Sequence, residues 1–437
     1  MSVPDPVELL QRLIRVDTTN PPGDEGALVG YLDGLLREAG IATTLVESAP
    51  GRPNLIARLP GGGSARPLLM QGHLDVVPAS EHGWTHPPFS GELADGFVWG
   101  RGALDMKSGL VMMLTALLRM VAAGSTPPGD VVFALLADEE AGGEAGAKYL
   151  VERRPELFDG VRYAIGEFGG FTMEIAGRRF YPVQVAEKQI CTVRARLRAP
   201  GGHGSLAQPG GVTGRLAEVL RRLDRRQLPV HVTPVVKTMI EALAAELPAP
   251  ARRLASLLLR PRFTDPLLAA AGETGQLLAP LFHHTATPNI LRAGDTINVR
   301  PVVAEIDLDG RLLPGFGPAD LLAELTALLG DDVELDVVRY DPVEGEPDYG
   351  LFGTLASILR EQDPLALPVP MLMPASTDGR FFARLGIQTY GYTPMTLPAS
   401  MKFTRLVHGV DERIPVEAVE FGTGCVTRLL ERFGEAE

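Results

Sequence analysis

The chain has 437 residues, of which 45% are hydrophobic and 22% are charged, as in an ordinary soluble globular protein. This length exceeds what one ordinary hydrophobic core accommodates, so we expect two domains. The net charge of −13 at pH 7 argues against nucleic acid as a partner, because phosphate binding requires a basic face.

The first part of the chain alternates helices and strands. Asp5 can cap a first helix in which Pro6 suits the first helical position, and the periodicity predicts a second helix ending at Gly40. Further elements are expected as strands at 41–46, 54–59, 68–77 and 131–136, and as helices at 107–123 and 144–153. This order predicts an α/β sheet with helices on both faces.

The pattern changes near Glu187. A half-exposed strand, a Gly/Pro loop and a basic helix are followed by a Leu-, Ala- and Pro-rich helical insertion and then by more strands around one helix. The corresponding ranges are 189–198, 200–211, 212–226, 240–282, 296–313, 318–329 and 333–338. The sequence therefore predicts a small α+β unit inserted in the larger sheet, with domain parts 1–186, 187–341 and 342–437.

Two cysteines and the N-terminus bear on location. Cys191 and Cys425 lie far apart and form no CxxC pair, so neither a disulfide framework nor a thiolate zinc site is expected. Residues 1–17 carry acids within their apolar pattern, unlike a signal peptide. No stretch is long and apolar enough to span a membrane. We expect a cytoplasmic protein with no membrane partner.

His73 and Asp75 stand two residues apart at a strand end, so their side chains share one face. A metal-binding imidazole usually has its other ring nitrogen held by a carboxylate, and Asp75 can supply that contact. The alternative is an ordinary surface pair at the end of a strand, which is the commoner case for such a pair taken alone.

Further acids stand at the ends of other expected elements. Asp105, before the apolar helix, has helix capping as its structural alternative. Glu139 and Glu140 follow a strand and can diverge, so that one binds a metal and the other reaches its water, or both belong to a solvated turn. Glu167 ends another short strand, and His408 stands alone far downstream, where a structural role is the usual one.

Taken together these residues form a set with one chemistry. The members are His73, Asp105, Glu140, Glu167 and His408. All stand at element ends, where α/β sheets place their sites. Two imidazoles and three carboxylates suit two zinc-like ions. Two ions, three carboxylates and one bridging hydroxide also sum to a neutral site.

The motifs that carry these residues resemble one family of zinc hydrolases. It includes acetylornithine deacetylase, succinyl-diaminopimelate desuccinylase, aminoacylase, carboxypeptidase S and the glutamate-releasing carboxypeptidase. The resemblance runs nearly end to end. Its motifs are GHLDVVP (72–78), GWTHPPFSGELADGFVWGRGALDMKSG (83–109), ADEEAGGEAGAKYL (137–150), APGGHGS (199–205), INVRPVVAEIDLDGRLLPG (297–315), STDGRFFARLGI (376–387) and VHGVDERIPVE (407–417).

The resemblance implies an α/β fold, a dizinc aminopeptidase-like catalytic domain with a mixed sheet, and an inserted α+β lid and dimerisation domain. It implies that His73, Asp105 and Glu167 hold one Zn²⁺. Glu140 and His408 would hold the other, and Asp105 would bridge the two. Co²⁺ or Mn²⁺ could substitute for zinc. A cis peptide after Asp105 also belongs to the family pattern.

The same resemblance assigns catalytic roles. Asp75 would orient His73, Glu139 would be the general base, and His203 would stabilise the tetrahedral oxyanion, in this family often from the partner subunit of a homodimer. The matches Arg311, Asn289 and Arg380 imply contacts with the substrate, Arg311 with its carboxylate. Their alternatives are a turn Asn and surface arginines.

Two departures from the family pattern bear on the substrate. Glu167 is followed by Phe-Gly-Gly, whereas carboxypeptidase S-like members have Glu-Gly-Gly, so the motif is offset by one residue. The stretch from His203 to Asn298 is also long. The second departure favours carboxypeptidase S-like members. The expected function is hydrolysis of the amide bond in a peptide or N-acyl amino acid with a free carboxylate. Alternatives are a biosynthetic deacetylase or desuccinylase, and a non-catalytic binding protein on the same fold.

Overall fold

The computed structural model describes residues 3–80, 82–206, 209–343 and 345–436. The chain divides into two compact units. The first contains 1–185, 344–371 and 377–437, and the second contains 186–343 and 372–376. The predicted division at 186/187 and 341/342 lies within two residues of these bounds, apart from the short segment 372–376.

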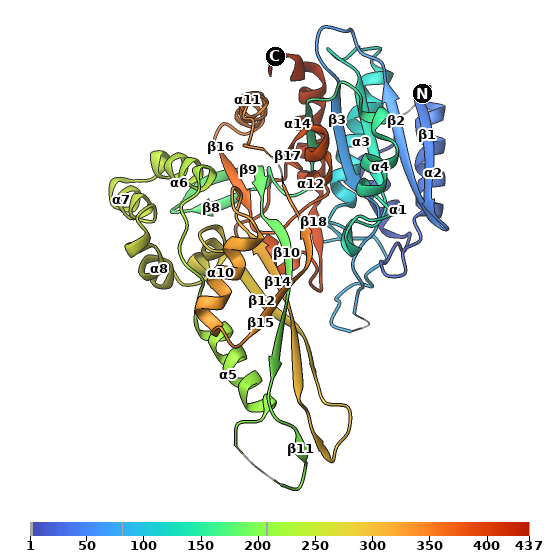
Figure 1. The fold of residues 1–437 in the computed structure, drawn as a ribbon. Coiled ribbons are helices and arrows are strands. Elements are labelled where there is room, and N and C mark those ends of the chain that lie inside the picture. Colours follow the sequence, from blue (N-terminus) through green and yellow to red (C-terminus); the bar gives the residue numbers. More distant parts are fainter. Residues whose placement is uncertain (1–2, 81, 207–208, 344, 437) are drawn as a thin grey trace. The chain divides into compact units, whose positions relative to one another are not determined.

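The first unit is organised by a mixed sheet, whose strands are drawn in Figure 1. Within the described residues its strand order is β1-β2-β6-β3-β7-β17-β9-β16, with β8 paired to β9. The strands are β1 (Ala42–Ala49), β2 (Arg52–Leu59), β3 (Leu68–His73), β6 (Val131–Leu136), β7 (Tyr163–Gly166), β8 (Met173–Ile175), β9 (Arg178–Glu187), β16 (Leu367–Met373) and β17 (Gln388–Gly391). The central strands β6, β3 and β7 are parallel neighbours.

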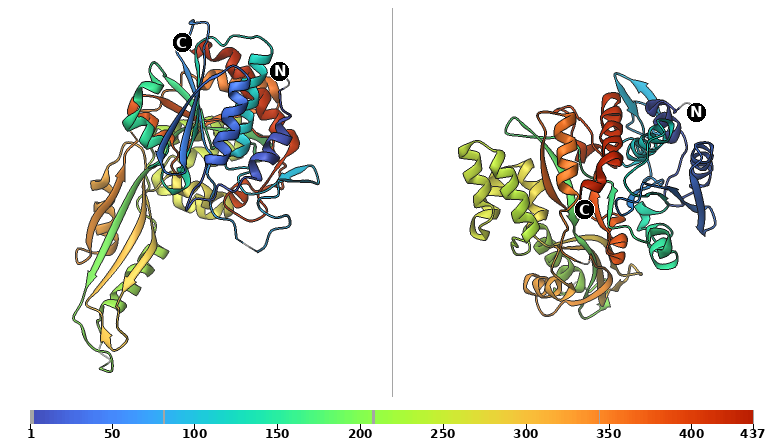
Figure 2. Two further views of the ribbon diagram at one scale, coloured as in Figure 1. Left: turned by 90° about the vertical axis from the view of Figure 1, so that its right-hand side faces the viewer. Right: turned by 90° about the horizontal axis from the view of Figure 1, so that it is seen from above.

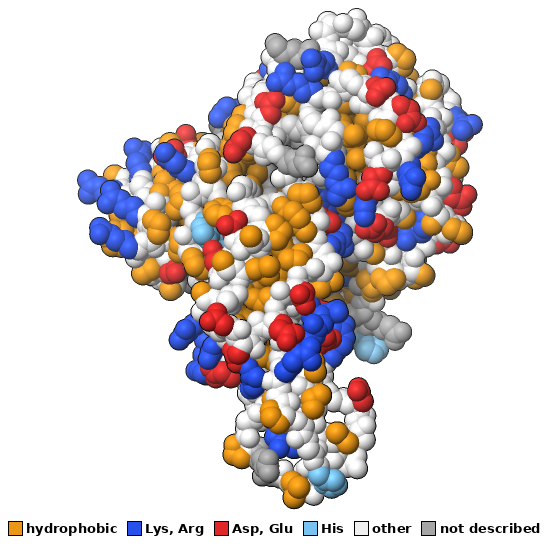
Figure 3. Space-filling view, in the orientation of Figure 1, with side chains coloured by type: hydrophobic (Ala, Val, Ile, Leu, Met, Phe, Trp, Pro, Cys, Tyr) orange, Lys and Arg blue, Asp and Glu red, His pale blue; other side chains and the backbone are white. Residues whose placement is uncertain are grey.

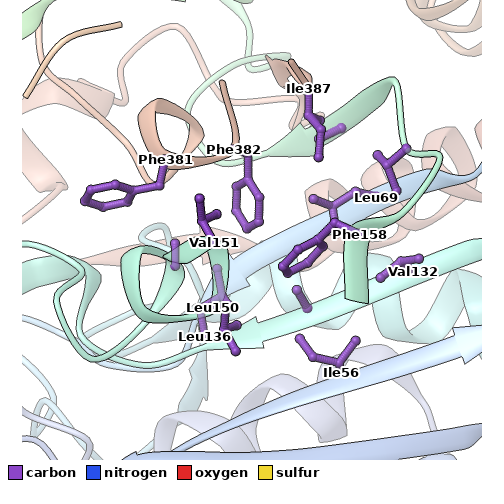
Figure 4. Close-up of a cluster of buried hydrophobic side chains, with 14 of the residues drawn as sticks. Ile56, Leu69, Val132, Leu136, Leu150, Val151, Phe158, Phe381, Phe382 and Ile387 are labelled. Atoms are coloured by element: carbon purple, nitrogen blue, oxygen red, sulfur yellow. The ribbon is translucent and has the colours of Figure 1, made fainter. Parts of the chain in front are cut away.

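Helices cover both faces of this sheet, as the alternating sequence pattern predicts. On β3, Gly72 faces Met106 and Leu110, at the start of α3 (Lys107–Ala122), so α3 lies on that face. Leu69 points the other way and packs in the cluster of Figure 4 with α4 (Ala147–Arg153) and α12 (Gly379–Phe382). Since side chains alternate along a strand, the sheet separates two apolar layers.

The other helices of the first unit come from its N-terminal and C-terminal segments. Asp5 caps α1 (Pro6–Ile14) by accepting hydrogen bonds from the backbone of Val7 and Glu8. The remaining helices are α2 (Gly26–Glu38), α11 (Phe352–Gln362), α13 (Phe403–Leu406) and α14 (Val416–Arg432), and α14 packs on α3. A small sheet joins β4 (Glu92–Ala94), β5 (Phe97–Trp99) and β18 (Arg413–Pro415).

The second unit has an antiparallel sheet of order β12-β14-β10-β15. Its strands are β10 (Gln189–Arg198), β12 (Thr285–Ala293), β14 (Val303–Leu312) and β15 (Glu334–Asp341). Helices α5 (Val212–Arg225) and α10 (Pro318–Leu329) bury their apolar residues against β10 and β14. A two-stranded ribbon of β11 (Gly202–His203) and β13 (Val299–Arg300) completes the strands. The sequence pattern did not indicate β12, most of whose residues are exposed.

The predicted helical insertion is a group of four helices. These are α6 (Pro234–Glu246), α7 (Ala249–Leu257), α8 (Pro261–Ala270) and α9 (Glu273–Leu278), which lie side by side in both views of Figure 2. Figure 3 shows Lys and Arg side chains gathered over α7 and α8. No helix among the described residues is long and apolar enough to cross a membrane.

Candidate metal centre

The candidate site lies at one edge of the first unit's sheet. Strands β6, β3 and β7 are parallel, so their carboxyl ends meet at the same edge. Glu139 and Glu140 form a short 3-10 turn after β6, His73 ends β3, and Glu167 directly follows β7. The chain thus brings residues from three separate segments to one place because their strands are neighbours in the sheet.

One group of potential ligands consists of His73, Asp105 and Glu167. The Nε2 atom of His73 lies 3.0 Å from Asp105 Oδ1 and 3.3 Å from Glu167 Oε2. Helix α3 begins at Lys107 and has no side-chain cap, which rules out the alternative role of Asp105 as its N-cap. The peptide bond between Asp105 and Met106 is cis, as the resemblance implies.

The second group shares Asp105 and adds Glu140 and His408. His408 Nε2 lies 3.2 Å from Asp105 Oδ2 and 3.2 Å from Glu140 Oε1. His408 has a backbone φ of +61°, in the left-handed region, which turns its side chain out of the loop between α13 and β18. Glu140 Oε1 is buried and makes no hydrogen bond of good geometry within the described part of the chain.

The tautomer of His73 follows from its outer hydrogen bond. The sequence predicts that Asp75 orients this ring. In the structure the contact is made by the main chain, because His73 Nδ1 donates to the Asp75 carbonyl oxygen at 2.9 Å. The carboxylate oxygen Oδ1 of Asp75 lies 3.6 Å from the same nitrogen. A proton on Nδ1 leaves the lone pair of Nε2 directed at Asp105 and Glu167. Three lone-pair atoms therefore converge, which is the arrangement a cation requires.

The pKa shifts in both ligand groups also favour a bound cation. Burial alone would lower the pKa of His73, but hydrogen bonds to Asp105 and Glu167 outweigh it and raise that pKa well above its ordinary value. Hydrogen bonds to Asp105 and Glu140 raise the pKa of His408 to about 10. Burial raises the pKa of Glu167 to about 8. In the protein by itself, protons neutralise the crowded acids, and divalent ions can do so in their place.

The donor set fits a pair of zinc-like ions. It offers two imidazole nitrogens and three carboxylates, in two groups that share one bridging acid. His73 Nε2 faces the carboxylates of Asp105 and Glu167, and His408 Nε2 faces those of Asp105 and Glu140, so each ring nitrogen points at the acids that would share an ion with it. The residues present therefore match what two metal ions need.

Glu139 lies outside both ligand groups. Burial raises its pKa well above the ordinary value, and repulsion from Glu167 adds to the effect. Arg380 Nη1 lies 3.9 Å from Glu139 Oε1. Arg380 is buried, so its alternative interpretation as a surface arginine is wrong; it also donates to the Gly142 carbonyl at 2.9 Å.

The acidic turn is held by Asp75, in a role that the sequence did not predict, and by Asn20, which the sequence analysis did not single out. The carboxylate of Asp75 accepts the backbone N–H groups of Glu139 and Glu140, each at 3.1 Å. Asn20 Nδ2 donates to Asp75 at 2.8 Å and to Asp138 at 3.0 Å. Asn20 stands directly before two prolines in the run TTNPPG, and this was the available signal in the sequence.

Behind Asn20 lies a buried ion pair. Arg52 donates to Asp138 at 3.2 Å and to both oxygens of Glu25 at 2.8 Å. Asp138 itself is only 7% exposed. Its backbone φ of +71° turns the chain out of β6 and into the Glu139–Glu140 turn.

Three predicted site residues belong to the second unit. His203 is exposed in β11, and its Nδ1 lies 2.8 Å from Ser205 Oγ. Asn289 is exposed at an irregular position of β12. The guanidinium of Arg311 is engaged by Asp309, through Nε at 2.7 Å and Nη2 at 3.2 Å, and its Nη1 donates to Ser376 at 3.3 Å. A substrate carboxylate at Arg311 would have to replace Asp309.

Comparison with known proteins agrees with this geometry. A family model described as peptidase family M20/M25/M40 matches residues 69–432. A probable carboxypeptidase S-like 2 from Dictyostelium discoideum is 29% identical over 376 residues, covering 81% of this chain and 69% of that protein. The human N-fatty-acyl-amino acid synthase/hydrolase PM20D1 is 29% identical over 385 residues, covering 84% of this chain and 74% of the relative.

The fold is also that of solved structures. Human carnosine dipeptidase 1 superposes with a TM-score of 0.69 at 16% identity, covering 98% of this chain and 96% of the other. At this level of identity the likeness concerns the fold, which is the mixed α/β architecture expected from the sequence.

Proposed function

This chain belongs to peptidase family M20/M25/M40 and is a metal-dependent hydrolase, and we propose that it cleaves the amide bond of a peptide or N-acyl amino acid with a free carboxylate. The observation that carries the proposal is the pair of ligand groups sharing Asp105, with one glutamate of the acidic turn left outside both. A carboxypeptidase S-like relative and an N-acyl amino acid hydrolase support the two substrate classes.

The proposed cofactor is two Zn²⁺ ions, with Co²⁺ or Mn²⁺ able to replace them. His73 and Glu167 would hold one ion, Glu140 and His408 the other, and Asp105 both. When bound, such ions acidify water and polarise the scissile carbonyl. The imidazole and carboxylate donors, with the Nδ1–H of His73 already committed to a carbonyl, support this assignment.

Glu139 is the proposed general base. Its carboxylate lies outside the ligand groups, and its backbone is fixed by Asp75 at 3.1 Å. It would take the proton of the attacking water and pass it to the leaving amine, a role that contributes about 10²–10⁴-fold to a rate. The guanidinium of Arg380, 3.9 Å away, opposes the burial and the repulsion from Glu167 that raise the pKa of Glu139.

Substrate contacts are proposed for Arg311, Asn289 and Arg380. His203 is the proposed oxyanion donor, from the same chain or from the partner in a homodimer, and such a donor contributes about 3–4 kcal/mol. The exposed imidazole of His203 supports a contact made outside its own ribbon. A cytoplasmic location stays a prediction; both cysteines are free and buried.

The decisive experiment combines chelation with one substitution. Removing metal should abolish amide hydrolysis, and Zn²⁺ or Co²⁺ should restore it. Glu139→Gln should retain two metal equivalents while kcat falls about 10²–10⁴-fold. Glu144→Gln, at the exposed end of the same acidic stretch, is the matched control and should keep full activity, because the described partner of Glu144 is Lys148 at the surface.

The substrate class needs a separate measurement. Dipeptides and N-acyl amino acids should be cleaved with higher kcat/KM than acetylornithine or succinyl-diaminopimelate. A preference for either of the last two would favour the biosynthetic deacylase. A wild-type protein that binds ligands but turns over none would favour the non-catalytic binding protein.

A further inference from the structure

A buried carboxylate beyond the proposed ligands touches the segment that carries Asp105. Glu412 is fully buried. Its Oε1 accepts the backbone N–H groups of Leu104 at 2.7 Å and Asp105 at 3.1 Å. Its Oε2 accepts from Gly102 N at 3.1 Å and from Arg101 Nη1 at 2.6 Å. Four donors thus converge on one side chain, three of them from the backbone of a single loop.

The same network reaches the segment of His408. Arg101, also buried, donates through Nη2 to the His408 carbonyl oxygen at 3.2 Å. The main chain adds a further link, since Gly100 N donates to the Glu412 carbonyl at 2.9 Å. Glu412 therefore connects two segments that lie about three hundred residues apart in the sequence, and each segment carries one proposed ligand.

We infer that Glu412 is a positioning residue for the metal centre, which sets the distance between Asp105 and His408 by holding the backbone of one and, through Arg101, the backbone of the other. This inference rests on the proposed function, since it assigns Glu412 a role in metal affinity. Asp105 and His408 meet at 3.2 Å between their side chains, so a small movement of either loop changes that distance directly.

An isosteric change tests this role. In Glu412→Gln an amide NH₂ replaces one oxygen and faces N–H donors, so at least two of the four hydrogen bonds are lost. The expected result is an affinity for metal lowered about 10–100-fold, with one of the two equivalents lost first. Metal content after dialysis and competition with a chromophoric chelator measure this, and the melting temperature of the metal-free protein is recorded in parallel.

Two variants complete the design. Glu417→Gln, an exposed glutamate in the first turn of α14, is the control and should bind metal as the wild type does. Glu412→Asp keeps the charge but is one methylene shorter, so its affinity should fall between those of Glu412→Gln and the wild type. It also tests the inference if the Gln variant does not fold.

The outcomes separate the inference from the proposed function. If the folded Glu412 variants bind two ions with wild-type affinity, or lower only the melting temperature of the metal-free protein, Glu412 is a structural residue and the inference is wrong. If the wild type binds no metal, the proposed function itself fails, and the role of Glu412 with it.

Discussion

Each unit of this protein contains imidazoles and carboxylates close enough to hold a metal, and the two sites differ in the hydrogen bond of one imidazole and in the number of carboxylates. In the first unit, His73 lies 3.0 Å from Asp105 and 3.3 Å from Glu167. In the second, Glu324 Oε1 lies 2.6 Å from His231 Nε2 and 3.9 Å from His284 Nε2. Distance alone does not distinguish them.

The hydrogen bond made by the outer ring nitrogen, Nδ1, distinguishes the two sites. His73 Nδ1 donates to a carbonyl, so its Nε2 keeps a lone pair for a metal. His284 Nδ1 instead accepts the backbone N–H of Leu313 at 3.2 Å, so the proton of the neutral ring sits on Nε2. Burial lowers the pKa of His284 to about 4, which keeps the ring neutral near pH 7. A ring held in this way cannot bind a metal through Nε2, and one carboxylate accompanies it instead of three.

The largest expected effect is on metal content, and it tests whether the two sites differ in metal binding. His408→Asn should lose a metal equivalent and lower kcat/KM by more than about 100-fold, because losing a ligand costs more than losing an outer partner. His284→Asn should keep both equivalents, since its side-chain oxygen can still accept the N–H of Leu313. Metal analysis of the two purified variants checks this. An equal loss of metal from both would show that the two groups are equivalent.

The next largest effect concerns the pH dependence of stability. The folded state takes up a proton on His284 only near pH 4, whereas the unfolded chain does so near pH 6.5. Stability contributed by the neutral ring is therefore present above pH 6.5 and lost as the pH falls to 4, by about 3 kcal/mol in total. Urea unfolding of metal-free protein at several pH values measures it. A His284→Asn variant with the wild-type slope would contradict this prediction.

The smallest effect concerns the hydrogen bonds behind the acidic turn of the first unit. Asn20→Ala leaves Asp75 and Asp138 each one donor short and should cost about 1–3 kcal/mol of unfolding free energy. Asn20→Asp, which is isosteric, adds a third acid and should cost more at pH 7 than at pH 5. Equal stability of the wild type and both variants would mean that this amide is dispensable.

The sequence was sufficient for the parts of the site that depend on short stretches of chain. His73 stands at a strand end and Glu139–Glu140 after the next strand of the sheet, and both positions follow from apolar runs and their polar ends. The α/β class and the inserted α+β unit follow from the same periodicity. The ordered series of motifs then predicted a family that the comparisons confirm.

What the sequence did not reveal depends on partners far along the chain. Asp138 and Arg52 are separated by 86 residues, and Asp138 and Asn20 by 118. No local pattern indicates such pairs, and nothing in the stretch around Asp138 distinguishes it from an ordinary polar residue at a strand end. The contact of Asp75 with His73 differs from the predicted one for another reason. Whether a His ring contacts the side chain or the main chain of a neighbour depends on rotamers, which periodicity does not fix.

The place of His408 in the chain has a consequence for biosynthesis. On the ribosome, His73, Asp105, Glu140 and Glu167 emerge first, and the whole second unit must follow before His408 and Glu412 are made. A chain at that stage still lacks one of the five proposed ligands. On the proposed function, it gains hydrolytic activity only after the segment of His408 has been made, so it cannot act on the peptides around it before then.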